Sequence, residues 1–129
     1  MKRVDIISDT HGYLSVPLLA ALEALGIPLK GVLGNNDRYY DYGSEVDVLS
    51  TFEFEGLVFA VSHYREDLPR HGADVCVCGH THRPVIEHAR RSLMVNPGST
   101  TYPRGGGGPT MARLMVEDGA IASAEIVHL

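Results

Sequence analysis

Short apolar segments separated by polar turns run through most of the chain. Residues 3–8 are largely apolar and end at Asp-Thr-His-Gly, which indicates a buried strand. Residues 15–25 predict a helix, because Ser15 can serve as its N-cap and Gly26 follows its last turn. Residues 28–33 predict a short strand that stops at the sequence Gly-Asn-Asn-Asp.

The second half of the chain alternates between strand patterns and turns. Residues 47–63 predict a hairpin whose turn lies near Glu55-Gly56 and whose second strand ends at His63. Residues 73–80 predict another strand that ends at a histidine. Two further hairpins are expected, one from residues 84–88 and 91–99, and one over residues 110–129 that turns at Asp118-Gly119. The glycine run in residues 104–109 is expected to be a loop.

These elements indicate an α/β fold with many strands and few helices. A length of 129 residues without internal repeats favours a single domain over residues 1–129. The net charge of −5 argues against a general binder of nucleic acids or membrane surfaces, which would need a basic face. We find no apolar segment long enough for a signal peptide or a membrane span.

The only two cysteines, Cys76 and Cys78, are poorly spaced for a disulfide with each other. We expect them to be small buried side chains on a core strand. A reducing cytoplasm is the simplest location for such a chain.

Four apolar strand patterns each end in a polar cluster that could bind a metal: Asp-Thr-His, Gly-Asn-Asn-Asp, Ser-His and Gly-His-Thr-His. Four of the seven histidines, His11, His63, His80 and His82, lie at these ends. Because α/β folds build their sites at the carboxyl ends of strands, we expect the clusters to converge on one pocket.

The spacing within each cluster allows both a functional and a plain structural interpretation. In an extended backbone, His80 and His82 would point to one side about 6.6 Å apart, which suits two neighbouring ions. They could equally be surface turn histidines. Asp9 and His11 share this spacing and could hold one ion, or Asp9 could cap a turn beside a solvated His11.

The other two clusters are weaker when each is taken alone. Asn35 and Asp37 offer hard oxygen ligands, although Gly-Asn-Asn-Asp is also common turn chemistry. His63 by itself would usually be structural. Together, Asp, Asn and His ligands suit Mn²⁺, Fe²⁺, Ni²⁺ or Zn²⁺, and the lack of cysteine ligands argues against a closed structural zinc site.

The order of these motifs resembles the calcineurin-like metallophosphoesterases, in particular the small bacterial and archaeal phosphodiesterase branch. The resemblance is carried by D-x-H, G-N-x-D, a strand-end histidine, G-H-x-H and the sequence Asn-Pro-Gly-Ser-Thr at residues 96–100. It implies a two-layer β-sandwich flanked by helices, with two divalent metals at one edge. It also implies hydrolysis of a small phosphodiester substrate by a metal-activated hydroxide.

The resemblance assigns roles to individual residues. It implies that Asp9, His11 and His82 hold the first metal, and that Asn35, His63 and His80 hold the second. Many members have a histidine proton donor where this chain has Asn36, so this donor is absent here. A substrate with a good leaving group, such as an aryl group, would need the donor least. Arg38 could contact a phosphate. The candidate catalytic residues are therefore Asn36, Asp37 and Arg38.

One family motif, a strand followed by Gly-Asp, has no counterpart here. Only 23 residues separate His11 from Asn35, so one helix and one central strand are expected to be missing. The absent aspartate bridges both metals in the family. Two dications about 3.7 Å apart repel by on the order of 15–20 kcal/mol at an effective dielectric of 20. We therefore predict one well-held ion, or two only when hydroxide or phosphate bridges them, with Asp37 as a candidate substitute.

Three functions follow from these observations. The first is a metal-dependent phosphodiesterase, with Mn²⁺ as the foremost metal. The second is a catalytically weak or inactive metal-binding scaffold, similar to the retromer scaffold subunit, and the third is a degraded chain without a stable site. A homodimer is also expected, since dimers are common among similar proteins. The remaining histidines, His71, His88 and His128, are expected to be solvated.

Overall fold

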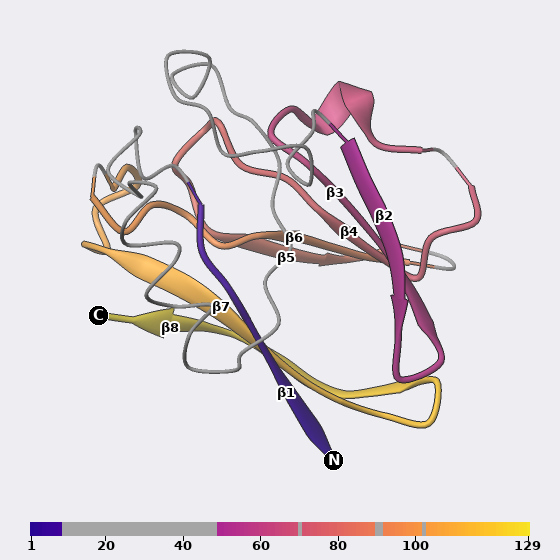
Figure 1. The fold of residues 1–129 in the computed structure, drawn as a ribbon. Helices are drawn as coiled ribbons and strands as arrows, with labels where there is room; N and C mark the ends of the chain where they lie inside the picture. Colours follow the sequence, from indigo (N-terminus) through magenta and orange to yellow (C-terminus); the bar gives the residue numbers. More distant parts are fainter. Residues whose placement is uncertain (9–48, 70, 90–91, 102) are drawn as a thin grey trace, which may run out of the picture.

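The computed structural model describes residues 1–8, 49–69, 71–89, 92–101 and 103–129 (Figure 1). These residues form strands and one 3₁₀ turn, η2 (Arg65–Asp67). The strands are β1 (Lys2–Ile6), β2 (Leu49–Phe54), β3 (Leu57–Ser62), β4 (Val75–Val77), β5 (Val85–His88), β6 (Leu93–Asn96), β7 (Thr110–Glu117) and β8 (Ala120–His128). The helix predicted at residues 15–25 and the strand predicted at residues 28–33 lie outside the described residues.

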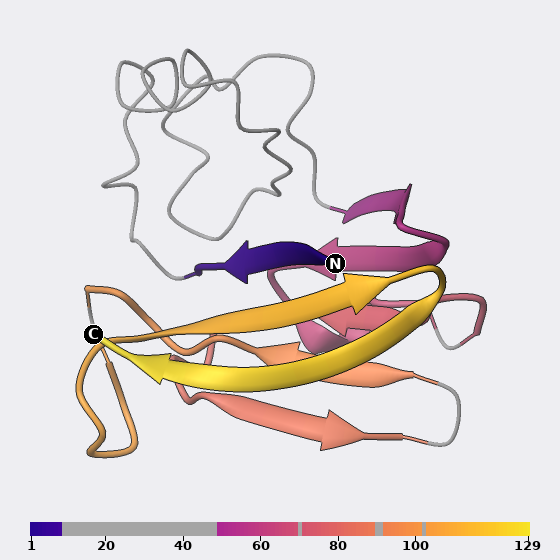
Figure 2. The same cartoon turned by 90° about the horizontal axis from the view of Figure 1, so that it is seen from below.

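The strands form two sheets that stack as layers (Figure 2). One sheet has the order β1-β7-β8 and is antiparallel throughout. The other has the order β2-β3-β4-β6-β5, in which β3, β4 and β6 run parallel and the two outer strands run antiparallel to their neighbours. The predicted two-layer β-sandwich is therefore confirmed, as are the three predicted hairpins.

The core lies between the two layers because alternate residues of each strand point inward. In β7 the buried positions are Thr110, Ala112, Leu114 and Val116, with partly exposed residues between them. Full burial of a leucine or valine side chain, such as Leu114 or Val116, contributes about 1.5–3 kcal/mol to folding. The buried hydrophobic cluster consists of Leu57, Phe59, Val75, Val77, Leu93, Val95, Ala112, Leu114 and Val116.

The two predicted hairpin turns lie where the sequence places them, and they contact each other. Glu55 and Gly56 have φ values of 51° and 78°, and Asp118 and Gly119 have values of 47° and 78°. Positive φ at both central residues defines the two-residue turn that matches the twist of a hairpin. Gly119 N donates a hydrogen bond to Glu55 O at 2.6 Å, and this bond ties the two sheets together at one end of the sandwich.

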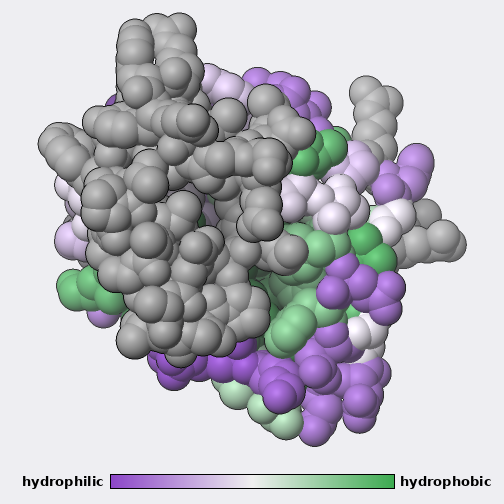
Figure 3. Space-filling model, viewed as in Figure 1, coloured by the Kyte–Doolittle hydropathy of each residue, from purple (hydrophilic) through white to green (hydrophobic). Residues whose placement is uncertain are grey.

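The outer side of the three-stranded sheet carries charged side chains. Asp5 accepts from Arg113 at 2.9 Å and pairs with Arg3 at 3.1 Å, and the hydrogen bond to Asp5 raises the pKa of Arg113. Hydrophilic residues also border the lower part of the face drawn in Figure 3.

Within the described ranges, no helix is long and apolar enough to cross a membrane.

Candidate metal centre

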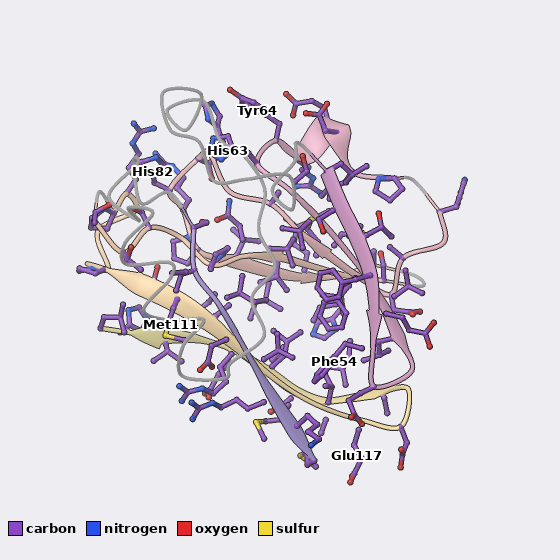
Figure 4. All side chains as sticks on the ribbon, viewed as in Figure 1. Phe54, His63, Tyr64, His82, Met111 and Glu117 are labelled. Carbon is purple, nitrogen blue, oxygen red and sulfur yellow. The ribbon has the colours of Figure 1, made fainter. Side chains whose placement is uncertain are left out.

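Three parallel strands of the larger sheet end at one edge. β3, β4 and β6 run in the same direction, so the residues that follow Ser62, Val77 and Asn96 emerge side by side. Pairing continues past the strand ends, because Gly79 N donates to His63 O at 3.0 Å. His63, Tyr64 and His82 accordingly lie at one end of the molecule, opposite Glu117 (Figure 4). Two of the four predicted polar clusters therefore meet at this edge.

The end of β1 joins the same edge from the other sheet. Ser8 Oγ donates to Gly98 O at 2.7 Å, and Gly98 follows the end of β6. Ser8 is the last described residue before the D-x-H motif. Asp9 and His11 themselves lie outside the described residues, as do Asn35, Asn36, Asp37 and Arg38. The predicted roles of these six residues therefore stay predictions.

The side chains of His63 and His80 contact each other through ring nitrogens. Nε2 of His63 lies 3.1 Å from Nδ1 of His80, and the two rings are inclined at 75°. Tyr64 packs against both rings, with centroid distances of 4.9 Å to His63 and 4.6 Å to His80. The tyrosine ring thus limits the orientations that the two imidazoles can adopt.

This nitrogen pair suits a shared cation. Imidazole nitrogens bind divalent transition metals at about 2.0–2.1 Å, so two nitrogens 3.1 Å apart can serve as adjacent ligands of one ion. Among the residues that the structure describes, no three His, Cys, Asp or Glu side chains form such a group. Further ligands would have to come from water, substrate or other residues, and the sequence-based candidate is the amide oxygen of Asn35. The histidine pair can supply two ligands of a metal site.

His82 differs from this pair in its burial. Its side chain is buried, with 4% of the residue exposed, whereas His80 is exposed. Its carbonyl oxygen accepts a hydrogen bond from Arg104 N at 3.1 Å, so the glycine-rich loop lies across it. The sequence-based division, with His63 and His80 on one ion and His82 on another, stays a prediction.

The expectation of an extended backbone between His80 and His82 is wrong. Their φ values are 69° and 61°, so both histidines adopt the left-handed conformation. The segment instead forms a tight turn in which Thr81 N donates to Gly79 O at 2.9 Å. The estimate of about 6.6 Å between residues two apart applies only to extended chain and therefore does not apply here.

Asn96 lies beneath this turn, and sequence reasoning gave it no role. Its amide nitrogen donates to Gly79 O at 3.2 Å and to Thr81 Oγ1 at 3.0 Å. Its amide oxygen accepts from Gly98 N at 3.0 Å. The sequence signals were its place in the Asn-Pro-Gly-Ser-Thr motif of the resemblance and its position as a polar residue at the end of an apolar strand.

A cavity of about 290 Å³ borders the turn on the side of β5. Its lining includes His80 and Thr81, the apolar side chains Val85 and Met94, and the ring of Tyr64. Arg65 and Glu87, which form an ion pair at 3.1 Å, also line it. The cavity thus offers carbon surface and charged side chains directly beside a candidate metal ligand.

The two cysteines form no disulfide. Each is 5% exposed, so the prediction of small buried side chains is confirmed, with Cys76 on β4 and Cys78 directly after it. Burial raises the pKa of the Cys76 thiol, which disfavours the thiolate needed for metal binding or nucleophilic attack.

The chain resembles known phosphoesterases in sequence. Residues 12–119 match the family model of the calcineurin-like phosphoesterase superfamily domain. A probable metallophosphoesterase of Methanothermobacter thermautotrophicus is 35% identical over 114 residues, which cover 80% of this chain and 64% of that relative. This chain therefore spans less than two thirds of the length of that relative.

A second relative bears on the missing segment. A probable metallophosphoesterase of Mycoplasma pneumoniae is 26% identical over an alignment of 151 residues that covers 95% of this chain and 94% of the relative. This alignment is 22 longer than the 129 residues of the chain, so the relative has residues within the aligned span that this chain lacks. This agrees with the predicted loss of a helix and a strand.

Two solved structures show the same fold. A structure described as a novel archaeal phosphodiesterase matches with a TM-score of 0.69 at 23% identity. The match covers 98% of this chain and 100% of the archaeal protein. Wild-type Vps29 of Entamoeba histolytica, solved in complex with zinc, matches with a TM-score of 0.62 at 16% identity. This match covers 89% of this chain and 76% of Vps29.

Proposed function

Because the chain belongs to the calcineurin-like phosphoesterase superfamily, we propose that it is a metal-dependent hydrolase of phosphodiesters. The observation that carries the proposal is the His63–His80 nitrogen pair, 3.1 Å apart at the edge where three parallel strands end. Two imidazoles brought together by separate strands suit a divalent ion better than they suit a packing role.

The protein's own residues hold and orient the reactants in this proposal. When bound, divalent ions supply positive charge that stabilises phosphate oxygens and makes water more acidic. His63 and His80 would hold one ion, and Tyr64 fixes both rings by packing against them. Asp9, His11, Asn35 and His82 complete the proposed ligand set, with Asn36, Asp37 and Arg38 as candidates for contact with the phosphate.

The preference for a diester rather than a monoester is supported by space beside the histidines. A diester carries a second substituent on phosphorus, and the cavity of about 290 Å³ next to His80 can accommodate one. By the resemblance, Asn36 stands where many family members carry a histidine proton donor. Its absence favours substrates whose leaving group needs little protonation, such as aryl diesters. The archaeal phosphodiesterase that shares the fold is consistent with this assignment.

For the ions we propose Mn²⁺ first, with Fe²⁺, Ni²⁺ and Zn²⁺ as other suitable metals, since imidazole, amide and carboxylate ligands accept all of them. Without the bridging aspartate of the family, one ion would be well held, and a second would need hydroxide or phosphate between the two. Buried cysteines that form no disulfide fit a reducing compartment such as the cytoplasm. We further propose a homodimer.

Hydrolysis of bis(p-nitrophenyl) phosphate and of p-nitrophenyl phosphate in the presence of Mn²⁺ tests the proposal. We expect turnover of the diester to exceed turnover of the monoester, and His80→Ala to lower the diester rate by at least about 100-fold. His71→Ala, which changes an exposed histidine elsewhere in the chain, is the matched control. Purified, Mn²⁺-loaded protein with no diester turnover above buffer would exclude the enzyme function.

The alternative function is a metal-binding scaffold with weak or no catalysis. It is favoured by the absence of a Gly-Asp motif between His11 and Asn35 and by the fold shared with Vps29. Mn²⁺ binding at micromolar concentration or tighter, without turnover of either ester, would select this function over the first. A stable protein partner recovered with the metal-loaded chain would then identify what it assembles with.

A further inference from the structure

We infer that Asn96 is a positioning residue that holds the turn of residues 79–82 in its left-handed form and thereby directs His80 towards the metal. The inference rests on the proposed function, because it concerns the ligand that this function assigns to His80. Asn96 belongs to β6, whereas the turn follows β4, so the effect acts between neighbouring strands.

The three hydrogen bonds of Asn96 fix the orientation of its amide group. Gly79 O can only accept and Gly98 N can only donate. The nitrogen of the amide must therefore face Gly79 and the oxygen must face Gly98. With Thr81 Oγ1 as the second acceptor, both amide hydrogens have partners. Aspartate would lack both donors, and leucine would lack all three polar contacts.

Asn96 is anchored in a rigid part of the molecule. Only 6% of the residue is exposed, and its neighbour Val95 is a fully buried member of the core. On its other side, the Pro97-Gly98 segment is held by Thr110, whose hydroxyl donates to Pro97 O at 2.8 Å. The Asn96 side chain thus ties the turn that carries the histidines to the core.

The turn needs such support because its conformation is unfavourable by itself. Left-handed φ values cost L-residues about 1–2 kcal/mol each, and His80 and His82 both have them. Thr81 lies between the two and is the residue whose hydroxyl Asn96 contacts; the same hydroxyl accepts from Arg83 N at 3.3 Å. Strained residues held by surrounding contacts are typical of functional sites.

The test compares Asn96→Asp with Val95→Ala in the full-length chain. Two quantities are measured: the Kd for Mn²⁺ by calorimetric titration, and amide hydrogen exchange of residues 81–83 in protein free of metal. Asn96→Asp keeps the acceptor for Gly98 and loses both donors. Mutation of a residue that orients a metal ligand typically lowers metal affinity 10–100-fold, so we expect the Mn²⁺ affinity of Asn96→Asp to fall by about that factor. The negative charge of the new aspartate by itself would favour Mn²⁺ binding and so acts against this loss. Exchange in the turn should rise at least about 10-fold.

Val95→Ala is the matched control, because it weakens the core beside Asn96 without touching its hydrogen bonds. It should lower Tm and leave both the Mn²⁺ affinity and the exchange of the turn unchanged. Thr81→Val removes one of the two acceptors at an exposed position and should give an intermediate loss of affinity. This variant keeps the inference testable if Asn96→Asp does not fold.

The outcomes separate this inference from the proposed function. If wild-type protein binds no Mn²⁺, the proposed function fails, while exchange in the turn still decides the role of Asn96. If wild-type protein binds Mn²⁺ and Asn96→Asp binds it equally well with unchanged exchange, the inference is overturned. Equal losses in Val95→Ala would also overturn it, since the turn would then respond to general destabilisation.

Discussion

The two ends of the sandwich each contain a pair of non-glycine residues with positive φ, for different reasons. At one end, Glu55 and Asp118 have φ values of 51° and 47°, each followed by glycine in a two-residue hairpin turn. At the other end, His80 and His82 have values of 69° and 61° in a turn that joins no hairpin. The hairpin residues obey local geometry, whereas the histidines depend on Asn96 from another strand.

This difference indicates where the molecule is less stable than it could be for the sake of function. The hairpin turns need left-handed residues in order to connect their strands, and they contact each other across the two sheets. The histidine turn joins no hairpin, so the connection between paired strands does not account for its left-handed residues. The hydrogen bonds from Asn96 to Gly79 O and Thr81 Oγ1 hold it in this form.

The largest expected effect concerns the loop that supports the histidine turn. Gly98 has a φ of 80°, and a Cβ added there would collide with Thr110 Oγ1 and crowd Pro84. Left-handed strain, overpacking and the lost Thr110 hydrogen bond together predict that Gly98→Ala lowers the free energy of unfolding by roughly 3–5 kcal/mol. Urea denaturation measures this change.

Gly105→Ala is the matched control for Gly98→Ala. Its φ of 95° carries the same backbone penalty, but nothing lies within 4 Å of an added Cβ. The expected loss is about 1–2 kcal/mol. Equal losses for the two alanine variants would show that the loop beneath the turn is not tightly packed.

His80→Gly should separate stability from function. Glycine accepts a φ of 69° without strain, so the free energy of unfolding should rise by up to about 1 kcal/mol. Loss of the imidazole should weaken Mn²⁺ binding by at least about 100-fold. Thermal denaturation and calorimetric titration measure the two effects. A variant that is less stable than the wild type would mean that the histidine is held there for packing.

Glu55→Asn is the corresponding change at the other end, with a smaller effect. Asparagine tolerates left-handed φ, and Asn-Gly is a preferred pair in this turn, so we expect stabilisation by about 0.5 kcal/mol with unchanged Mn²⁺ binding. Glu53→Asn, in the exposed part of β2, is the control and should be neutral or slightly destabilising. Stabilisation by both variants would refute the role of the turn geometry.

The smallest effect concerns β4, which leads from the hairpin end towards the histidines. Burial raises the pKa of Cys76 above its ordinary value of 9.0, so the folded state keeps a proton that the unfolded state loses as pH rises above 9. Stability should therefore decline from pH 8 to pH 10, and the decline should be shallower in Cys76→Ala. Urea denaturation at both pH values measures it; identical slopes would contradict the assignment.

Sequence patterns predicted the hairpin end well, because its causes are local. Glu55-Gly56 and Asp118-Gly119 lie between alternating apolar positions, and such turns follow from neighbouring residues alone. The histidine end was predicted only in part. Motif order singled out His63 and His80, and the structure brings their rings together, although their role as metal ligands stays a prediction. The left-handed backbone and the role of Asn96 depend on contacts between residues 15 and 17 positions apart. No local pattern encodes such contacts. The candidate ligands between residues 9 and 37 remain predictions from motif order.

Elemental analysis of protein purified without chelator tests the central claim most directly, that His63 and His80 together hold a divalent ion. We predict one to two divalent ions per wild-type chain and a loss of at least one ion in the His63→Ala/His80→Ala double variant. The control variant His71→Ala should match the wild type. Equal metal content in the wild type and the double variant, or none in either, would contradict the account.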